Sequence, residues 1–147
     1  MEVRLARPDD TAAVADVYIA SFGTLTFLPR LHTEDETRAW IENVVLAHQE
    51  VWVAELEGDV VGMASLSDRV LEHFYVAPGA QSCGVGSALL AKVKERRPSG
   101  FTFWVFQQND NARRFYERRG CRLLELTDGS QNEEKTPDAL YEWRPAP

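Results

Sequence analysis

One stretch constrains the fold of this chain more than any other: residues 71–90, LEHFYVAPGAQSCGVGSALL. Its first part is rich in aromatic and β-branched side chains, which favour a strand, and Pro78-Gly79 ends that strand. Gly84-Val85-Gly86 then begins a segment in which apolar residues recur at about the 3.6-residue period of a helix. The sequence therefore predicts a strand, a glycine-rich turn and a helix in succession.

The predicted turn suits an anion. A helix begins with unpaired backbone N–H groups and with the positive end of its macrodipole. Gly84 and Gly86 lack the Cβ atoms that would keep a ligand's oxygens away from these groups, so a phosphate or a diphosphate is the simplest ligand. A P-loop is excluded because no Lys-Ser or Lys-Thr pair follows the glycines. A dinucleotide fingerprint is excluded because its third glycine would fall at Leu89.

The composition narrows the class of protein. The chain has 147 residues, of which 44% are hydrophobic and 27% charged, as is typical of one globular domain with one core. It contains no long apolar run and no signal peptide, so we expect a cytoplasmic protein with no membrane segment. Cys83 and Cys121 are too few for a disulfide framework and stand in no Cys/His cluster, so we expect no metal site.

The net charge of −7 argues against a nucleic-acid partner. It also means that an anionic ligand needs local positive charge. Basic side chains that could supply this charge, or could simply form solvated helix faces, are Lys92, Lys94, Arg96, Arg97, Arg113 and Arg114.

The rest of the chain alternates between strands and helices. Besides the strand and helix already described, we expect helices at residues 11–21, 33–48 and 109–119, and strands at residues 2–7, 50–56, 60–67, 101–106, 121–126 and 140–144. In the second helix the predicted buried stripe is Trp40, Ile41, Val44 and Val45. The strand at residues 101–106 follows a helix and should lie parallel to the strand that precedes the turn.

Three segments resemble the GCN5-related N-acetyltransferase (GNAT) superfamily. Gln81 to Gly86 fits the family's Q/R-x-x-G-x-G/A turn. Residues 109–121, NDNARRFYERRGC, resemble its N-x-x-A-x-x-F-Y-x-x-x-G-F segment, with Cys121 where Phe is usual. Residues 127–134, with Pro137-Asp138, resemble the tail of many bacterial members of unassigned substrate. The element order β-α-α-β-β-β-α-β-α-β-β is also that of this fold.

The resemblance implies a single N-acetyltransferase domain over residues 1–147. Its fold class would be α/β (α+β), with a mixed sheet of six to seven strands and four helices. It also implies a reaction in which a primary amine of a small molecule or protein directly attacks acetyl-CoA, the co-substrate. The turn would hold the diphosphate, and the main chain of Val76 would pair with the pantetheine arm and polarise the thioester carbonyl. The implied cofactor-binding residues are Phe74, Tyr75, Val76, Gln81, Ser82, Cys83, Gly84, Val85, Gly86, Ser87, Asn109, Ala112, Phe115 and Tyr116.

The resemblance and the strand pattern together suggest an acid and a base. Tyr116 is the candidate general acid for the leaving thiolate, and its phenol has an ordinary pKa of about 10; a plain core tyrosine is the alternative. Glu72 is the candidate base because strand alternation places it on the face of Phe74 and Val76. The alternatives are an edge-facing or salt-bridged glutamate, or a water chain. Asn109 would bind the pantetheine arm, cap a helix, or do both.

Two irregular links should select the acceptor. The link at residues 22–32 would overhang the acetyl group, as in related folds. The link at residues 127–139 carries acidic residues that could attract a cationic amine: Asp128, Glu133, Glu134 and Asp138. A transferase of longer acyl groups and a non-catalytic acyl-CoA sensor stay open as alternatives, as does a structural interaction module. Tyr141 and Trp143 could belong to a homodimer seam or to the core.

Overall fold

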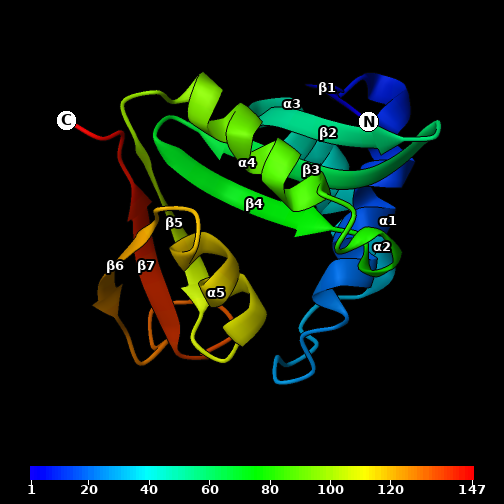
Figure 1. The fold of residues 1–147 in the computed structure, drawn as a ribbon. Helices are drawn as coiled ribbons and strands as arrows, with labels where there is room; N and C mark the ends of the chain where they lie inside the picture. The colour runs from blue at the N-terminus through cyan, green and yellow to red at the C-terminus, as the bar shows by residue number, and fades with distance from the viewer.

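A computed structural model describes residues 1–147 as a seven-stranded sheet with helices on both faces (Figure 1). The strand order across the sheet is β1-β2-β3-β4-β5-β7-β6. The strands are β1 (Glu2–Leu5), β2 (Glu50–Leu56), β3 (Asp59–Ser67), β4 (Val70–Val76), β5 (Phe101–Phe106), β6 (Arg122–Leu126) and β7 (Asp138–Trp143). The helices are α1 (Thr11–Phe22), α2 (Glu34–Trp40), α3 (Leu46–His48), α4 (Val85–Arg96) and α5 (Asp110–Glu117). The predicted fold class and the predicted element order are confirmed.

The sheet consists of two antiparallel halves joined by one short parallel contact. Strands β1 to β4 form an antiparallel meander, and β7 pairs antiparallel with both β5 and β6. Between the halves, β4 and β5 run parallel, as predicted, but pair only at Val70 and Thr102. Beyond that point the two strands diverge, so the carboxyl end of β4 lacks a neighbour on one side (Figure 1).

Each face of the sheet has its own hydrophobic core. One cluster packs under α4 and α5 and contains Leu89, Phe103 and Tyr116. The other packs under α1 and contains Val14 and Val53, both of which are completely buried. The amphipathic helices therefore cover both faces of the sheet.

Local signals place several elements correctly. Strands β2 and β5 have the predicted bounds. The hairpin between β2 and β3 turns at Glu57 and Gly58, with φ angles of 52° and 87°, as a tight hairpin requires. The side chains of Thr33 and Glu36 form a reciprocal capping box at the start of α2.

The second predicted helix is interrupted. A π-helical segment at Ile41–Val45 separates α2 from α3. Ile41 and Val45 are completely buried, but Val44 is 41% exposed, so its assignment to the buried stripe is wrong. The wider turn of a π-helix breaks the 3.6-residue spacing on which the prediction rests.

The other corrections concern the ends of elements. Gly84 lies before α4 as its N-cap residue, and Asn109 caps α5. Strand β7 begins at Asp138, two residues earlier than predicted, because the pairing with β5 extends to Phe106. Tyr141 is completely buried, so it belongs to the core and not to a surface seam.

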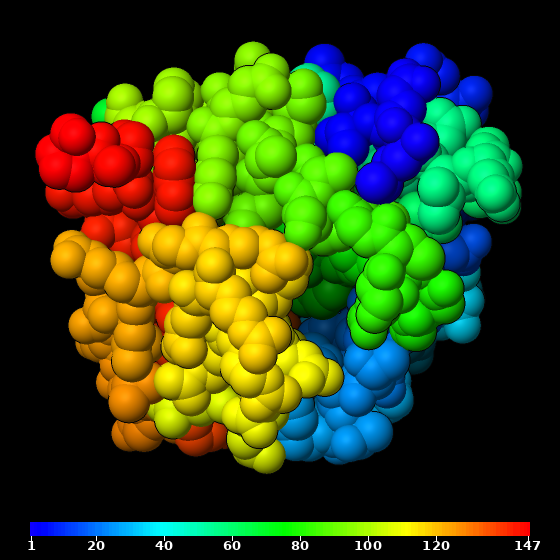
Figure 2. Space-filling view, viewed as in Figure 1, coloured from blue at the N-terminus to red at the C-terminus, as the bar shows by residue number.

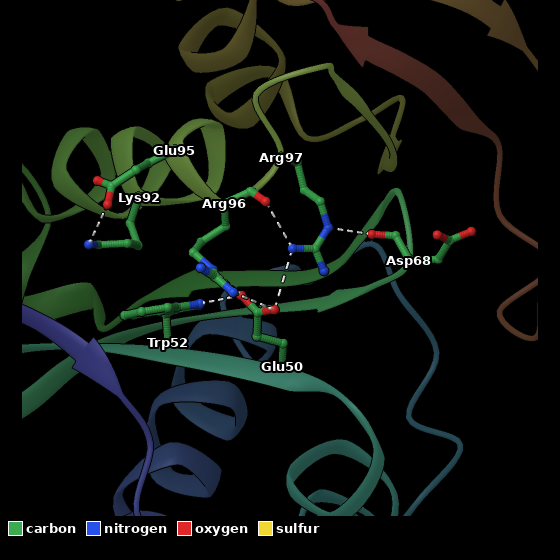
Figure 3. Close-up of polar contacts among 7 residues, drawn as sticks. All are labelled: Glu50, Trp52, Asp68, Lys92, Glu95, Arg96 and Arg97. Carbon is green, nitrogen blue, oxygen red and sulfur yellow. Dashed lines mark hydrogen bonds and ion pairs between the residues drawn. The ribbon is translucent and has the colours of Figure 1, made fainter.

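The carboxyl end of α4 is anchored by a polar cluster centred on Glu50 (Figure 3). The Glu50 carboxylate accepts hydrogen bonds from Arg96 Nε at 2.8 Å and from Trp52 Nε1 at 2.7 Å. The contact with Arg96 is the main cause that lowers the pKa of Glu50 to about 2. Arg97 reaches the same carboxylate and also donates to the backbone oxygen of Asp68. The cluster fixes α4 against β2 and the turn between β3 and β4.

Candidate active site

The turn before α4 presents a row of unpaired backbone donors. The first hydrogen bond of α4 runs from Ala88 N to Gly84 O, at 3.1 Å. The N–H groups of Ser82 and of residues 84–87 donate to no acceptor within the protein. Positive φ angles at Ser82 (71°) and Gly84 (80°) shape this turn. Such a row of free donors at a helix start suits a phosphate group.

The two glycines of the turn have different roles. A Cβ at Gly84 would meet no atom within 4 Å, but its left-handed backbone favours glycine. A Cβ at Gly86 would lie 3.0 Å from the ring of Phe115. Gly86 therefore allows α5 to pack closely against the first turn of α4.

The main chain of Val76 faces the gap between β4 and β5. Ala77 N donates to Val61 O at 2.8 Å, so the neighbouring pair of Gly62 and Val76 is a non-hydrogen-bonded pair of the antiparallel ladder. The N–H and C=O groups of Val76 consequently point away from β3. Its oxygen accepts a hydrogen bond from Ser21 Oγ at 2.8 Å, which joins α1 to this position. The Val76 N–H points into the gap. Because hydrogen-bonded and non-hydrogen-bonded pairs alternate along the ladder, the N–H and C=O groups of Phe74 also point away from β3.

Tyr75 and His73 lie on the other face of the sheet, as alternation predicts. The Tyr75 ring packs edge-on against Tyr18 of α1, with ring centroids 5.0 Å apart. Burial lowers the pKa of His73 to about 4, so this imidazole is neutral at pH 7. The side chain of Tyr75 thus faces α1, away from the turn at α4.

A β-bulge changes the expected surroundings of Glu72. The register shifts between Ser65 and Leu66 of β3, so Leu71 pairs with Leu66 and His73 with Ser65. Leu71 packs into the core cluster that Phe74 and Val76 adjoin, on the face where Glu72 was expected. The alternation that placed Glu72 beside Phe74 and Val76 is broken at this bulge, and Glu72 is exposed. Its assignment as the base stays a prediction.

Tyr116 is buried among aromatic rings. It is 6% exposed, and its ring centroid lies 4.3 Å from that of Phe103 and 5.8 Å from that of Phe74. Burial raises the pKa of Tyr116 well above its ordinary value, so the phenol keeps its proton at neutral pH. The hydroxyl makes no hydrogen bond within the protein. The hydroxyl therefore stays available as a donor to a bound ligand, as a group that protonates a substrate would be.

The other residues of the α5 segment frame the same region. Asn109 Oδ1 accepts from Ala112 N at 3.3 Å, so the predicted capping role is confirmed, while its amide nitrogen has no partner within the protein. Ala112 packs against the core beneath α5. The surface is hollowed between α5 and the residues of β4 and α4 (Figure 2).

The two irregular links meet beside α1. His32 Nε2 lies 2.5 Å from Glu133 Oε1, although the residues are 101 positions apart. A cavity of about 270 Å³ opens there, walled by Tyr18 and Phe22 and bordered by both links. Glu133 and Glu134 line it. Burial, followed by nearby acidic groups, raises the pKa of Glu134.

The other two acids of the later link lie elsewhere. The buried Asp138 accepts hydrogen bonds from Thr127 and Asn132, and Asp128 accepts from Ser130 N. A larger hollow of about 410 Å³ lies at the opposite end of β4 and β5 and contains none of the predicted site residues.

The basic residues expected to help an anion have other partners. Lys92 pairs with Glu95, and Arg96 and Arg97 contact Glu50. Lys94 donates to the backbone of residue 119, Arg113 donates to Tyr141, and Arg114 donates to Asn111.

The cation beside the turn is Arg119, which the sequence analysis did not identify. Its Nη2 lies 3.0 Å from Ser87 Oγ, and its guanidinium lies 3.8 Å from the Phe115 ring centroid. The spacing of four residues between Phe115 and Arg119, one helical turn, is the signal that could have indicated the stacking.

Comparison with known proteins identifies the class. A family profile described as an acetyltransferase (GNAT) domain matches residues 47–121. The peptidyl-lysine N-acetyltransferase YiaC of Escherichia coli K12 is 31% identical over 104 residues, which cover 70% of this chain and 69% of YiaC.

Solved structures share the fold over nearly the whole chain. Apo YjaB from Escherichia coli superposes with a TM-score of 0.80 at 22% identity, covering 99% of this chain and 98% of YjaB. The structure of yncA from Salmonella typhimurium with its cofactor acetyl-CoA gives a TM-score of 0.75 at 24% identity, covering 100% of this chain and 97% of yncA.

The chain belongs to the GNAT family. It is an acetyl-CoA-dependent N-acetyltransferase, and acetyl-CoA is its co-substrate. None of its helices combines the length and the apolar character that a membrane-spanning segment requires.

Proposed function

We propose that this protein transfers the acetyl group of acetyl-CoA to a primary amine, of a small molecule or a protein, by direct attack in a ternary complex. The observation that carries the proposal is the gap between β4 and β5, into which the Val76 N–H points. The donor turn lies at one end of this gap. Helix α1 forms one wall of the acidic cavity, and its Ser21 hydroxyl donates a hydrogen bond to the oxygen of the same residue, Val76.

Each group in the region has a chemical role in this reaction. The free N–H groups of residues 84–87 hold the diphosphate, and the Val76 N–H stabilises the negative charge that develops on the thioester oxygen. The nitrogen of the neutral amine forms a bond with the acetyl carbon while the carbon–sulfur bond breaks. The departing sulfur takes a proton from the Tyr116 hydroxyl, and the amine's proton passes through water to Glu72. Glu72 then releases a proton to solvent and the Tyr116 phenolate takes one up, which restores both groups.

The acidic cavity binds the acceptor in this proposal. Tyr18 and Phe22 supply an apolar wall, and Glu134 supplies an anionic group for an ammonium. The similarity to YiaC, which is named a peptidyl-lysine N-acetyltransferase, supports a lysine side chain as one acceptor to test.

The proposal is tested by measuring release of free CoA with a panel of amines, which includes amino acids, diamines and lysine peptides. At least one amine should release CoA, and Tyr116→Phe should lower kcat about 100-fold while leaving the affinity for CoA unchanged. The Tyr116 hydroxyl has no partner within the protein, so thermal stability should be preserved. Tight CoA binding with no amine consumed would instead indicate a non-catalytic sensor. No CoA binding at all would refute the proposal.

A further inference from the structure

None of the basic residues that the sequence suggested forms a hydrogen bond or an ion pair with the turn before α4. Arg96 and Arg97 are held by Glu50 at the far end of α4, and Lys92 is paired with Glu95. The chain as a whole carries a net charge of −7, which repels a polyanionic co-substrate. Local positive charge beside the turn would offset that repulsion.

The fold brings the side chain of Arg119 to the turn before α4. Its Nε and Nη2 donate to Ser87 Oγ, at 3.3 and 3.0 Å, and its Nη1 donates to Phe115 O, at 3.0 Å. Ser87 belongs to the first turn of α4, where the backbone donors are free. The guanidinium therefore lies next to the proposed diphosphate site.

The arginine is held in place but its charge is not neutralised. The guanidinium stacks on Phe115, and the same ring fills the space left by the missing Cβ of Gly86. All of its partners are neutral: a hydroxyl, a carbonyl and an aromatic ring. No carboxylate pairs with it, and a guanidinium with three contacts keeps two N–H groups for another acceptor.

We propose that Arg119 binds a phosphate group of CoA, and so adds a charged contact to the backbone donors of the turn. The inference rests on the proposed diphosphate site. A planar guanidinium with spare N–H groups matches the geometry of phosphate oxygens, and stacking on Phe115 pre-organises it. The phosphate is either the diphosphate or the 3′-phosphate of the nucleotide, which share this chemistry.

Calorimetric titration of the full chain with CoA tests the inference. Arg119→Met keeps an apolar stem over Phe115 but removes the charge, and it should weaken CoA binding about 10-fold, the size of one charge-assisted contact. Arg119→Lys should recover part of the loss. The matched control is Arg118→Met, since Arg118 is exposed and its side chain makes no hydrogen bond or ion pair in the structure.

Further measurements separate phosphate binding from a packing role. Arg119→Met should reduce the dependence of CoA affinity on salt concentration, which lost packing would not change. Titration of both proteins with 3′-dephospho-CoA locates the contact. If Arg119→Met still weakens binding of this ligand, Arg119 contacts the diphosphate. If the variant and the unmodified protein bind it equally well, Arg119 contacts the 3′-phosphate.

Different results would refute the inference about Arg119 and the proposed diphosphate site. If the Arg119 and Arg118 variants bind CoA equally well, or if the salt dependence is unchanged, the inference about Arg119 is wrong. If the unmodified protein itself does not bind CoA, the proposed diphosphate site fails, whatever Arg119 does.

Discussion

The turn before α4 and the cavity beside α1 are built in contrasting ways. The turn uses the backbone N–H groups of Ser82 and of residues 84–87, at the start of one helix. The cavity uses side chains from α1 and from two irregular links that meet at His32 and Glu133. One region presents hydrogen-bond donors with a nearby cation, and the other presents carboxylates.

This is the difference expected if the turn binds acetyl-CoA and the cavity binds the amine, as proposed. A co-substrate common to all members can be held by main-chain groups, which depend on local conformation and on glycine. An acceptor that varies among members requires side chains on links, which tolerate change more readily than a strand or a helix does. The two regions should therefore respond independently to substitution.

The largest effect on ligand binding is expected at the turn. Gly86→Val would place side-chain atoms against Phe115, where a Cβ alone lies 3.0 Å from the ring. We expect CoA binding to weaken about 30-fold, or about 2 kcal/mol, in calorimetric titration. Gly79→Val is the matched control, because a Cβ at Gly79 would meet no atom within 4 Å. Unchanged CoA affinity in the Gly86 variant would contradict the role assigned to the turn.

A smaller effect is expected in the cavity. Glu134→Gln removes the carboxylate that would pair with an ammonium, so KM for a cationic amine should rise about 10-fold while the affinity for CoA stays the same. Asp128→Asn on the same link is the control, since Asp128 does not line the cavity. Equal amine KM values for both variants, measured by CoA release, would remove Glu134 from the acceptor site. A parallel loss of CoA affinity would show that the two regions are not independent.

The smallest effect on ligand binding is expected from the cluster that anchors α4. Glu50→Gln should lower the free energy of unfolding by about 1–2 kcal/mol in urea titration at pH 7, because Glu50 loses charged contacts with Arg96 and Arg97. The affinity for CoA should change less than twofold, since the turn lies at the other end of α4. Lost CoA affinity at unchanged stability would contradict a purely supporting role.

The pH dependence of this stabilisation follows from the pKa of Glu50. Its value of about 2 in the folded protein lies below the ordinary value of 4.5. The stabilisation is therefore fully present above pH 5 and is lost as the pH falls from about 4.5 towards 2. The difference in stability between the unmodified protein and Glu50→Gln should shrink over that range, and a constant difference would contradict the assignment.

Much of the fold follows from local patterns. Alternation gives the bounds of β2 and β5, and local turn and cap residues form the Glu57-Gly58 hairpin and the capping box at Thr33. The failures occur where a local period is broken. The π-helical segment exposes Val44, and the bulge opposite Leu66 breaks the alternation at Glu72. Neither irregularity has a residue that marks it clearly in the sequence.

The sequence by itself determined the donor turn, because its strand, its glycines and its helix are neighbours along the chain and their conformations are set locally. It could also name Tyr116 and Asn109 as candidates, since both lie in one short segment. Only the tertiary structure decided which charges lie near the turn and which line the cavity. Arg119 reaches Ser87 across 32 positions and His32 reaches Glu133 across 101. Such contacts arise from the packing of helices and links, and no local pattern specifies that packing.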